Sequence, residues 1–158
     1  MVCQARVPTL GARSYSHRGF LIAGGLYLVE IKEVDVSGAG IDAPSGVRFH
    51  ICDKHGQCCT TNDFSDTERG NFTTYDVDPG DPCSDIKLDK YHPMEDGQTF
   101  EIEHFGSDGT TMDFVSFYMD GKTSISCWDS TSEEEHLYLT GGAGTRINMF
   151  CMSEIEFP

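Results

Sequence analysis

Apolar residues recur at every second position in several short stretches of this chain, and this alternation limits the folds open to it. Val47, Phe49 and Ile51 alternate with polar residues, and the runs 100–104 and 113–119 follow the same period. A period of two places successive side chains on opposite faces of a strand, so each run predicts a β-strand. Glycine, aspartate and proline separate the runs and predict tight turns. No segment has helical periodicity, and the sequence predicts an all-β fold, an antiparallel β-sandwich of two sheets.

The alternation begins near Leu26 and divides the chain into two parts. Residues 1–24 are mixed, basic and unpatterned, which predicts a flexible N-terminal segment, whereas residues 25–158 suffice for a single domain with its own core. The apolar run 19–29 resembles a signal-peptide core, but acids follow it without a cleavage site, so we interpret its second half as a strand. No run reaches the roughly 18 apolar residues of a membrane-spanning helix, so we expect no transmembrane segment.

The net charge restricts the partners of the chain. Asp and Glu number 26 against 11 Lys and Arg, which gives a formal charge of −15. Nucleic-acid phosphates would be repelled, so we expect no nucleic-acid partner. The same charge disfavours direct docking on an anionic membrane, but it suits a protein that collects cations.

Seven cysteines favour an oxidising compartment, and we expect a secreted, extracellular protein with disulfide bonds. Cys3 is our choice for the unpaired thiol. The cluster His50, Cys52, His55 and Cys58 could be read as zinc ligands, but it lacks paired knuckle spacing, and a disulfide-fastened hairpin is the preferred interpretation. We expect six cysteines to pair, with Cys127 bonded to Cys151 and two bonds among the remaining four: Cys52, Cys58, Cys59 and Cys83. Asn71 begins an Asn-Phe-Thr glycosylation sequon.

The stretch Gly38-Ala39-Gly40-Ile41-Asp42-Ala43 joins two predicted strands. Its glycines and Asp42 suffice for a well-made turn. The string also resembles the PLAT family, the β-sandwich modules attached to lipoxygenases, pancreatic lipases and polycystins, whose first two strands are joined by a Gly-Ala-Gly-Thr-Asp-Ala loop. The segments 64–72 and 100–117 match further family features, and the resemblance covers roughly residues 26–120. It implies a PLAT-like sandwich, with a C-terminal extension from about residue 122.

The resemblance implies a calcium site at one end of the sandwich, where Asp42 is the residue that matches. We add Asp108 from the second loop and Gly38 as a candidate carbonyl donor, because calcium prefers six to eight oxygen ligands. Three further acids, Asp63, Asp66 and Asp113, are candidates to complete the shell. Acidic turns that bind no ion remain the alternative interpretation.

No catalytic set is evident in the sequence, which contains neither a Gly-x-Ser-x-Gly elbow nor a His-Glu-x-x-His motif. The glycines at 141–144 predict a hairpin loop between Leu137–Leu139 and residues 146–152. We therefore expect a secreted, non-catalytic binding module that recognises a protein or a lipid surface through its end loops, with calcium as a candidate cofactor. The alternatives are a structural subunit of an extracellular assembly and a lectin-like or toxin-associated module.

Overall fold

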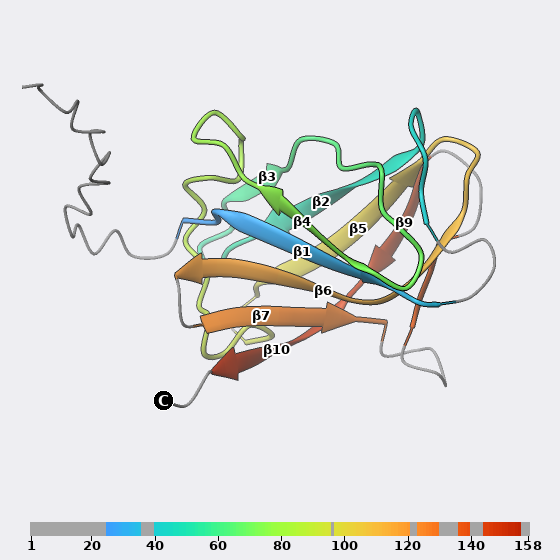
Figure 1. Ribbon diagram of the computed structural model, residues 1–158. Helices are drawn as coiled ribbons and strands as arrows, with labels where there is room; N and C mark the ends of the chain where they lie inside the picture. Colours follow the sequence, from blue (N-terminus) through green and yellow to red (C-terminus); the bar gives the residue numbers. More distant parts are fainter. Residues whose placement is uncertain are drawn as a thin grey trace, which may run out of the picture.

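The computed structural model describes residues 25–35, 40–95, 97–120, 123–129, 136–139 and 144–155, so the segment 1–24, Cys3 and Gly38 lie outside the described residues. The described part of the chain forms strands joined by turns (Figure 1). The strands are β1 (Leu28–Glu33), β2 (Gly46–Cys52), β3 (Cys58–Thr60), β4 (Phe72–Asp76), β5 (Thr99–Phe105), β6 (Thr110–Asp120), β7 (Thr123–Trp128), β8 (Leu137–Leu139), β9 (Thr145–Asn148) and β10 (Phe150–Ile155). No helix among these residues could span a membrane.

The strands form two antiparallel sheets that face each other, and the predicted sandwich is confirmed. One sheet has the order β10-β7-β6-β1-β4, with β8 also pairing with β6, and the other has the order β3-β2-β5-β9. Figure 1 shows β1, β6 and β7 in front of β2 and β5. The consecutive strands β1 and β2 belong to different sheets.

The core lies between the sheets and is built from the residues that the alternation predicted. Phe49 of β2 meets Phe117 of β6 edge to face, with ring centroids 5.1 Å apart. Phe100 of β5 packs on the same Phe117 ring at 5.7 Å. All three rings are fully buried. Aromatic pairs of this geometry add about 0.5–1.5 kcal/mol each beyond the apolar area that they bury.

One prediction for the C-terminal part is wrong. The glycine-rich segment does not close a hairpin, because β8 pairs with β6 and β9 pairs with β5, in different sheets. The strands β7 and β10 belong to the first sheet and β9 belongs to the second. The local pattern identified these strands but not the sheet to which each belongs.

Three disulfide bonds fasten the fold. Cys52 is bonded to Cys58 across the β2–β3 hairpin, Cys59 to Cys83, and Cys127 to Cys151 across the neighbouring strands β7 and β10. Because Cys52 and Cys58 are joined to each other, they are not available as zinc ligands.

Candidate functional site

Three loops meet at the end of the sandwich where β1 and β5 end and where β2, β4 and β6 begin. We call residues 40–45, 64–70 and 106–109 the end loops. They lie together at the side toward which β5 points in Figure 1. The first two are joined by a backbone bridge, in which Ile41 and Thr67 exchange N–H···O bonds of 3.2 and 3.1 Å.

Carboxylates from the second and third end loops reach the backbone of the first loop at residues 42 and 43. The backbone N–H of Asp42 donates to Asp108 Oδ2 at 3.0 Å, and the N–H of Ala43 donates to Asp66 Oδ1 at 3.3 Å. Asp66 has a positive φ of 61°, a conformation that is uncommon for a residue other than glycine and that directs its short side chain toward the first loop. The structure thus brings together Asp42, Asp108 and Asp66.

The other two acids that the sequence suggested are engaged elsewhere. Asp63 Oδ1 lies 3.0 Å from Arg48 Nε, and Asp113 Oδ1 lies 2.9 Å from His136 Nδ1. These partners are distant in the sequence, so no local pattern could have excluded the two acids.

The third loop is fixed from both sides. Ser45 Oγ accepts hydrogen bonds from the N–H groups of Ser107 and Asp108, each at 3.1 Å. On the other side, Nε2 of the buried His104 donates to the carbonyl oxygen of Asp108 at 2.5 Å. The position of the Asp108 carboxylate therefore depends on groups in the first loop and in β5.

Gly106 makes this arrangement possible. Its φ is +92°, and a Cβ at this position would lie 2.3 Å from Ser45 Oγ. We expect Gly106→Ala to lower the free energy of unfolding by on the order of 2 kcal/mol, because the change forces both an unfavourable backbone conformation and a clash. Chemical denaturation checks the value, with Gly56→Ala as the control, since Gly56 also has positive φ but open space around it. Equal losses in the two variants would show that the contact with Ser45 is unimportant.

A buried acid lies beneath the end loops. Glu33, the last residue of β1, is fully buried between the sheets. Its Oε1 accepts a hydrogen bond from Thr67 Oγ1 and its Oε2 accepts one from Thr110 Oγ1, both at 2.7 Å. Thr67 Oγ1 in turn accepts a bond of 2.9 Å from the N–H of Ile41. Burial raises the pKa of the Glu33 carboxyl to about 7, although the two hydroxyl donors act in the opposite direction.

The residue types at the end loops fit calcium, but their present arrangement does not form a complete shell. Carboxylate oxygens are the ligands that calcium prefers, and three loops supply them here. Within the residues that the structure describes, however, no group of three or more His, Cys, Asp or Glu side chains is placed to hold a metal ion. Two of the carboxylates point at backbone N–H groups, so they would have to turn to bind a cation.

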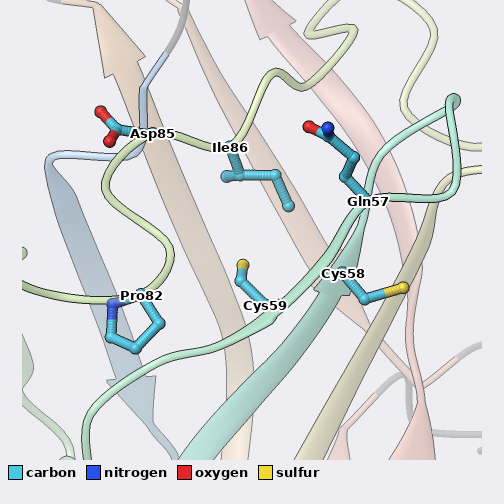
Figure 2. Close-up of a pocket in the computed structure, with 6 residues that line it drawn as sticks. All are labelled: Gln57, Cys58, Cys59, Pro82, Asp85 and Ile86. Carbon is cyan, nitrogen blue, oxygen red and sulfur yellow. The ribbon is translucent and has the colours of Figure 1, made fainter.

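A hollow lies at the end of the sandwich opposite the end loops, beside two of the disulfide bonds. It has a volume of about 400 Å³ and is lined by Gln57, Cys58, Cys59, Pro82, Asp85 and Ile86. Figure 2 shows the Gln57 amide and the Ile86 side chain on two sides of it, and the sulfur atoms of Cys58 and Cys59 diverge. Its polar side chains, Gln57 and Asp85, are exposed, which differs from a ligand pocket with convergent polar groups.

The outer face of the second sheet contains a row that resembles a hydrolytic triad. His50 lies between Thr60 Oγ1, 2.8 Å from Nδ1, and Glu103 Oε2, 2.5 Å from Nε2. The hydrogen bond from His50, followed by the charges of nearby arginines, lowers the pKa of the Glu103 carboxyl. Glu103 also pairs with Arg146 at 3.3 Å. These residues lie on the neighbouring strands β2, β3 and β5 and are not among those that line the hollow, so we interpret the row as an ion-pair network on the sheet surface.

Asn71 of the sequon lies between the second end loop and β4. It is exposed, and its amide Nδ2 donates to Glu68 Oε2 at 2.9 Å. Its backbone carbonyl accepts from the N–H of Glu33 at 3.1 Å. Modification of this side chain stays a prediction, and a glycan there would be attached beside the end loops.

No family model and no curated protein matches the chain. Solved structures with a similar fold include the alpha-toxin from Clostridium absonum, with a TM-score of 0.49 and 17% identity over 84% of this chain and 33% of the toxin chain. They also include a lipoxygenase variant and a related variant in complex with arachidonate, each with a TM-score of 0.49 and 16% identity over 80% of this chain and 16% of the other. This chain therefore spans about a third of the toxin and about a sixth of the lipoxygenase.

Proposed function

We propose that this chain is a secreted, non-catalytic binding module of PLAT type that docks on a lipid surface through its end loops, with calcium between the loops and the surface. The observation that carries the proposal is the meeting of Asp42, Asp66 and Asp108, one from each end loop, at the backbone of residues 42 and 43. Gly38, outside the described residues, remains the proposed carbonyl donor. A protein surface is the alternative target for the same loops.

Charge supports a role for a cation in this docking. The chain carries a formal charge of −15, so an anionic lipid surface repels it unless a cation intervenes. Calcium, when bound, would supply positive charge that both carboxylates and lipid phosphates can share. The residues after the third loop support docking by charge over insertion, since Thr110 and Met112 are buried within β6.

The three disulfide bonds support the proposed extracellular location. Disulfides persist in oxidising compartments and are rare where thiols are kept reduced. Free calcium is also abundant outside cells, where modules with weak affinity, about 10⁻⁴–10⁻³ M, are typical.

Calcium titration tests the proposal. A bound ion stabilises the native state by mass action, so at about 100 times the dissociation constant we expect about 2.7 kcal/mol of added stability, seen as a higher melting temperature. The same calcium should promote co-sedimentation with phosphatidylserine vesicles. Asp42→Ala and Asp108→Asn should lose both effects, whereas Asp85→Asn, an exposed acid at the opposite end, should keep them.

Two outcomes would contradict this proposal in different ways. Vesicle binding that persists in chelator would show that docking does not require calcium, and only the end loops would remain in the proposal as the docking surface. A melting temperature that calcium raises equally in wild type and in Asp42→Ala would place the ion elsewhere.

A further inference from the structure

Glu33 is connected to all three end loops through short hydrogen bonds. We call Glu33, Thr67, Thr110 and the N–H of Ile41 the Glu33 network. Thr67 lies in the second loop beside Asp66, and Thr110 directly follows the third loop. Ile41 lies in the first loop beside Asp42 and reaches Glu33 through the Thr67 hydroxyl. A single buried carboxyl group therefore holds the three segments that carry the candidate ligands.

The two branches of the network differ in how they accommodate a proton on Glu33. The Thr67 hydroxyl accepts from Ile41 N–H and has one hydrogen, which it donates to Glu33 Oε1. This branch needs Oε1 to be an acceptor. A proton is therefore accommodated on Oε2. The bond that Thr110 Oγ1 donates to the carboxylate then reverses, so that the O–H of the protonated Glu33 donates to Thr110 Oγ1. The neutral acid satisfies both branches without a buried charge.

The charged form is costly in this position. Glu33 is surrounded by the core, and the described residues place no ion-pairing partner on its carboxylate. The nearest base along the strand, Lys32, donates instead to the carbonyl of Gly70 at 2.6 Å. A buried carboxylate without a counter-charge favours any motion that admits water or a cation.

The other titratable groups at this end of the sandwich do not connect all three end loops as Glu33 does. Tyr75 of β4 donates its hydroxyl to the carbonyl of Ser65, and burial, then the charges of Asp66 and Glu33, raise the pKa of its phenol above its ordinary value. Asp66 and Asp108 accept from backbone N–H groups of the first loop. His104 of β5 is held by the carbonyl of Asp108, and Asp35 pairs with Arg69.

We infer that Glu33 is a positioning residue for the end loops, which it holds in one closed arrangement while its carboxyl group is protonated and releases when that group becomes charged. This inference takes its functional meaning from the proposed end-loop site, because it makes the arrangement of Asp42, Asp66 and Asp108 depend on pH. A cation at the loops would compensate the charge on Glu33, so proton loss and cation uptake would favour each other.

Amide hydrogen exchange tests this inference on the calcium-free protein. The readout is the protection of the Ile41 and Thr67 amides, which form the bridge between the first two loops, at about pH 6 and about pH 8 after correction for intrinsic exchange. A carboxyl with a pKa of about 7 in the closed form and 4.5 in the open form predicts about a tenfold loss of protection over this interval. Glu33→Gln retains the hydrogen-bonding shape without a titrating group and should show no pH-dependent loss.

Glu30→Gln is the matched control, because Glu30 lies on the same strand with its side chain on the outer face, where it accepts from Tyr118. It should behave like the wild type. Equal pH dependence in wild type and Glu33→Gln, or none in wild type, would overturn the inference. Neither result would affect the proposed function, since no calcium or vesicle is present, and a failed calcium titration would leave this test intact.

Discussion

Removing the Cys59–Cys83 bond by a double change to alanine is expected to lower the free energy of unfolding by about 3.5 kcal/mol. A cross-link restricts the unfolded chain more when it closes a longer loop, and the 24-residue separation of this pair gives that value in the chain-entropy estimate. Cys83 is also fully buried, so its loss removes core packing in addition. Guanidinium unfolding at equilibrium, fitted with a separate slope for each variant, measures the change.

The matched control is the double alanine variant of Cys52 and Cys58. Their separation of 6 residues closes a short hairpin, for which the same estimate gives about 2.3 kcal/mol. We therefore expect the Cys59–Cys83 variant to unfold first under denaturant. A larger loss for the hairpin bond would contradict the entropic account and would indicate that strain or packing decides the ranking.

Replacing Glu33 by glutamine is expected to change how global stability depends on pH. Burial raises the pKa of this carboxyl from its ordinary value of 4.5 to about 7 in the folded chain. Between these values the unfolded chain loses the proton while the folded chain keeps it. The contribution of Glu33 to stability is thus complete below about pH 4.5 and is lost as the pH rises through about 7. The total loss is on the order of 3 kcal/mol.

The measurement is the difference in unfolding free energy between Glu33→Gln and wild type, taken at intervals from about pH 4 to about pH 8. This difference should move in favour of the variant by on the order of 3 kcal/mol across the interval. Glu30→Gln, which changes the same charge on the outer face of β1, should show a much smaller trend. A difference that stays constant with pH would mean that Glu33 has the same proton affinity in both states.

The alternating runs predicted the strands well because burial on one face imposes a period of two on the residues. Val47, Phe49 and Ile51 point inward in β2, as their spacing required. The pairing of β8 and β9 with different sheets could not be predicted in the same way. It depends on which sheet edge lies nearest in three dimensions, and no local pattern encodes that choice.

The candidate site was predictable only where a loop had a recognisable sequence. Asp42 and Asp108 belong to loops with such a pattern, and the structure brings them together. The sequence could not distinguish Asp66 from Asp63 and Asp113 as a candidate ligand. Asp66 reaches the first loop from a backbone with positive φ. Asp63 and Asp113 pair instead with Arg48 and His136, which are distant in the sequence.

Glu33 was missed although a signal for it exists in the sequence. Val29, Ile31 and Glu33 follow one another at a spacing of two, so all three side chains point to the same face of the strand. Because Val29 and Ile31 predict that this face is buried, the sequence places an ionisable residue at a buried position. An acid on the buried face of a strand is uncommon, because a charge is costly in a core unless hydrogen bonds stabilise it or a proton neutralises it. Such a break in an alternating run therefore marks a position where a buried hydrogen-bond network is expected.

The described chain enters at residue 25 before β1 and leaves at residue 155 after β10, and both points lie at the end of the sandwich remote from the end loops. An affinity tag, a flexible linker or a neighbouring module joined at either point would therefore emerge on the far side. When the protein is immobilised through such a tether, the end loops face away from the support, which suits surface-based binding assays.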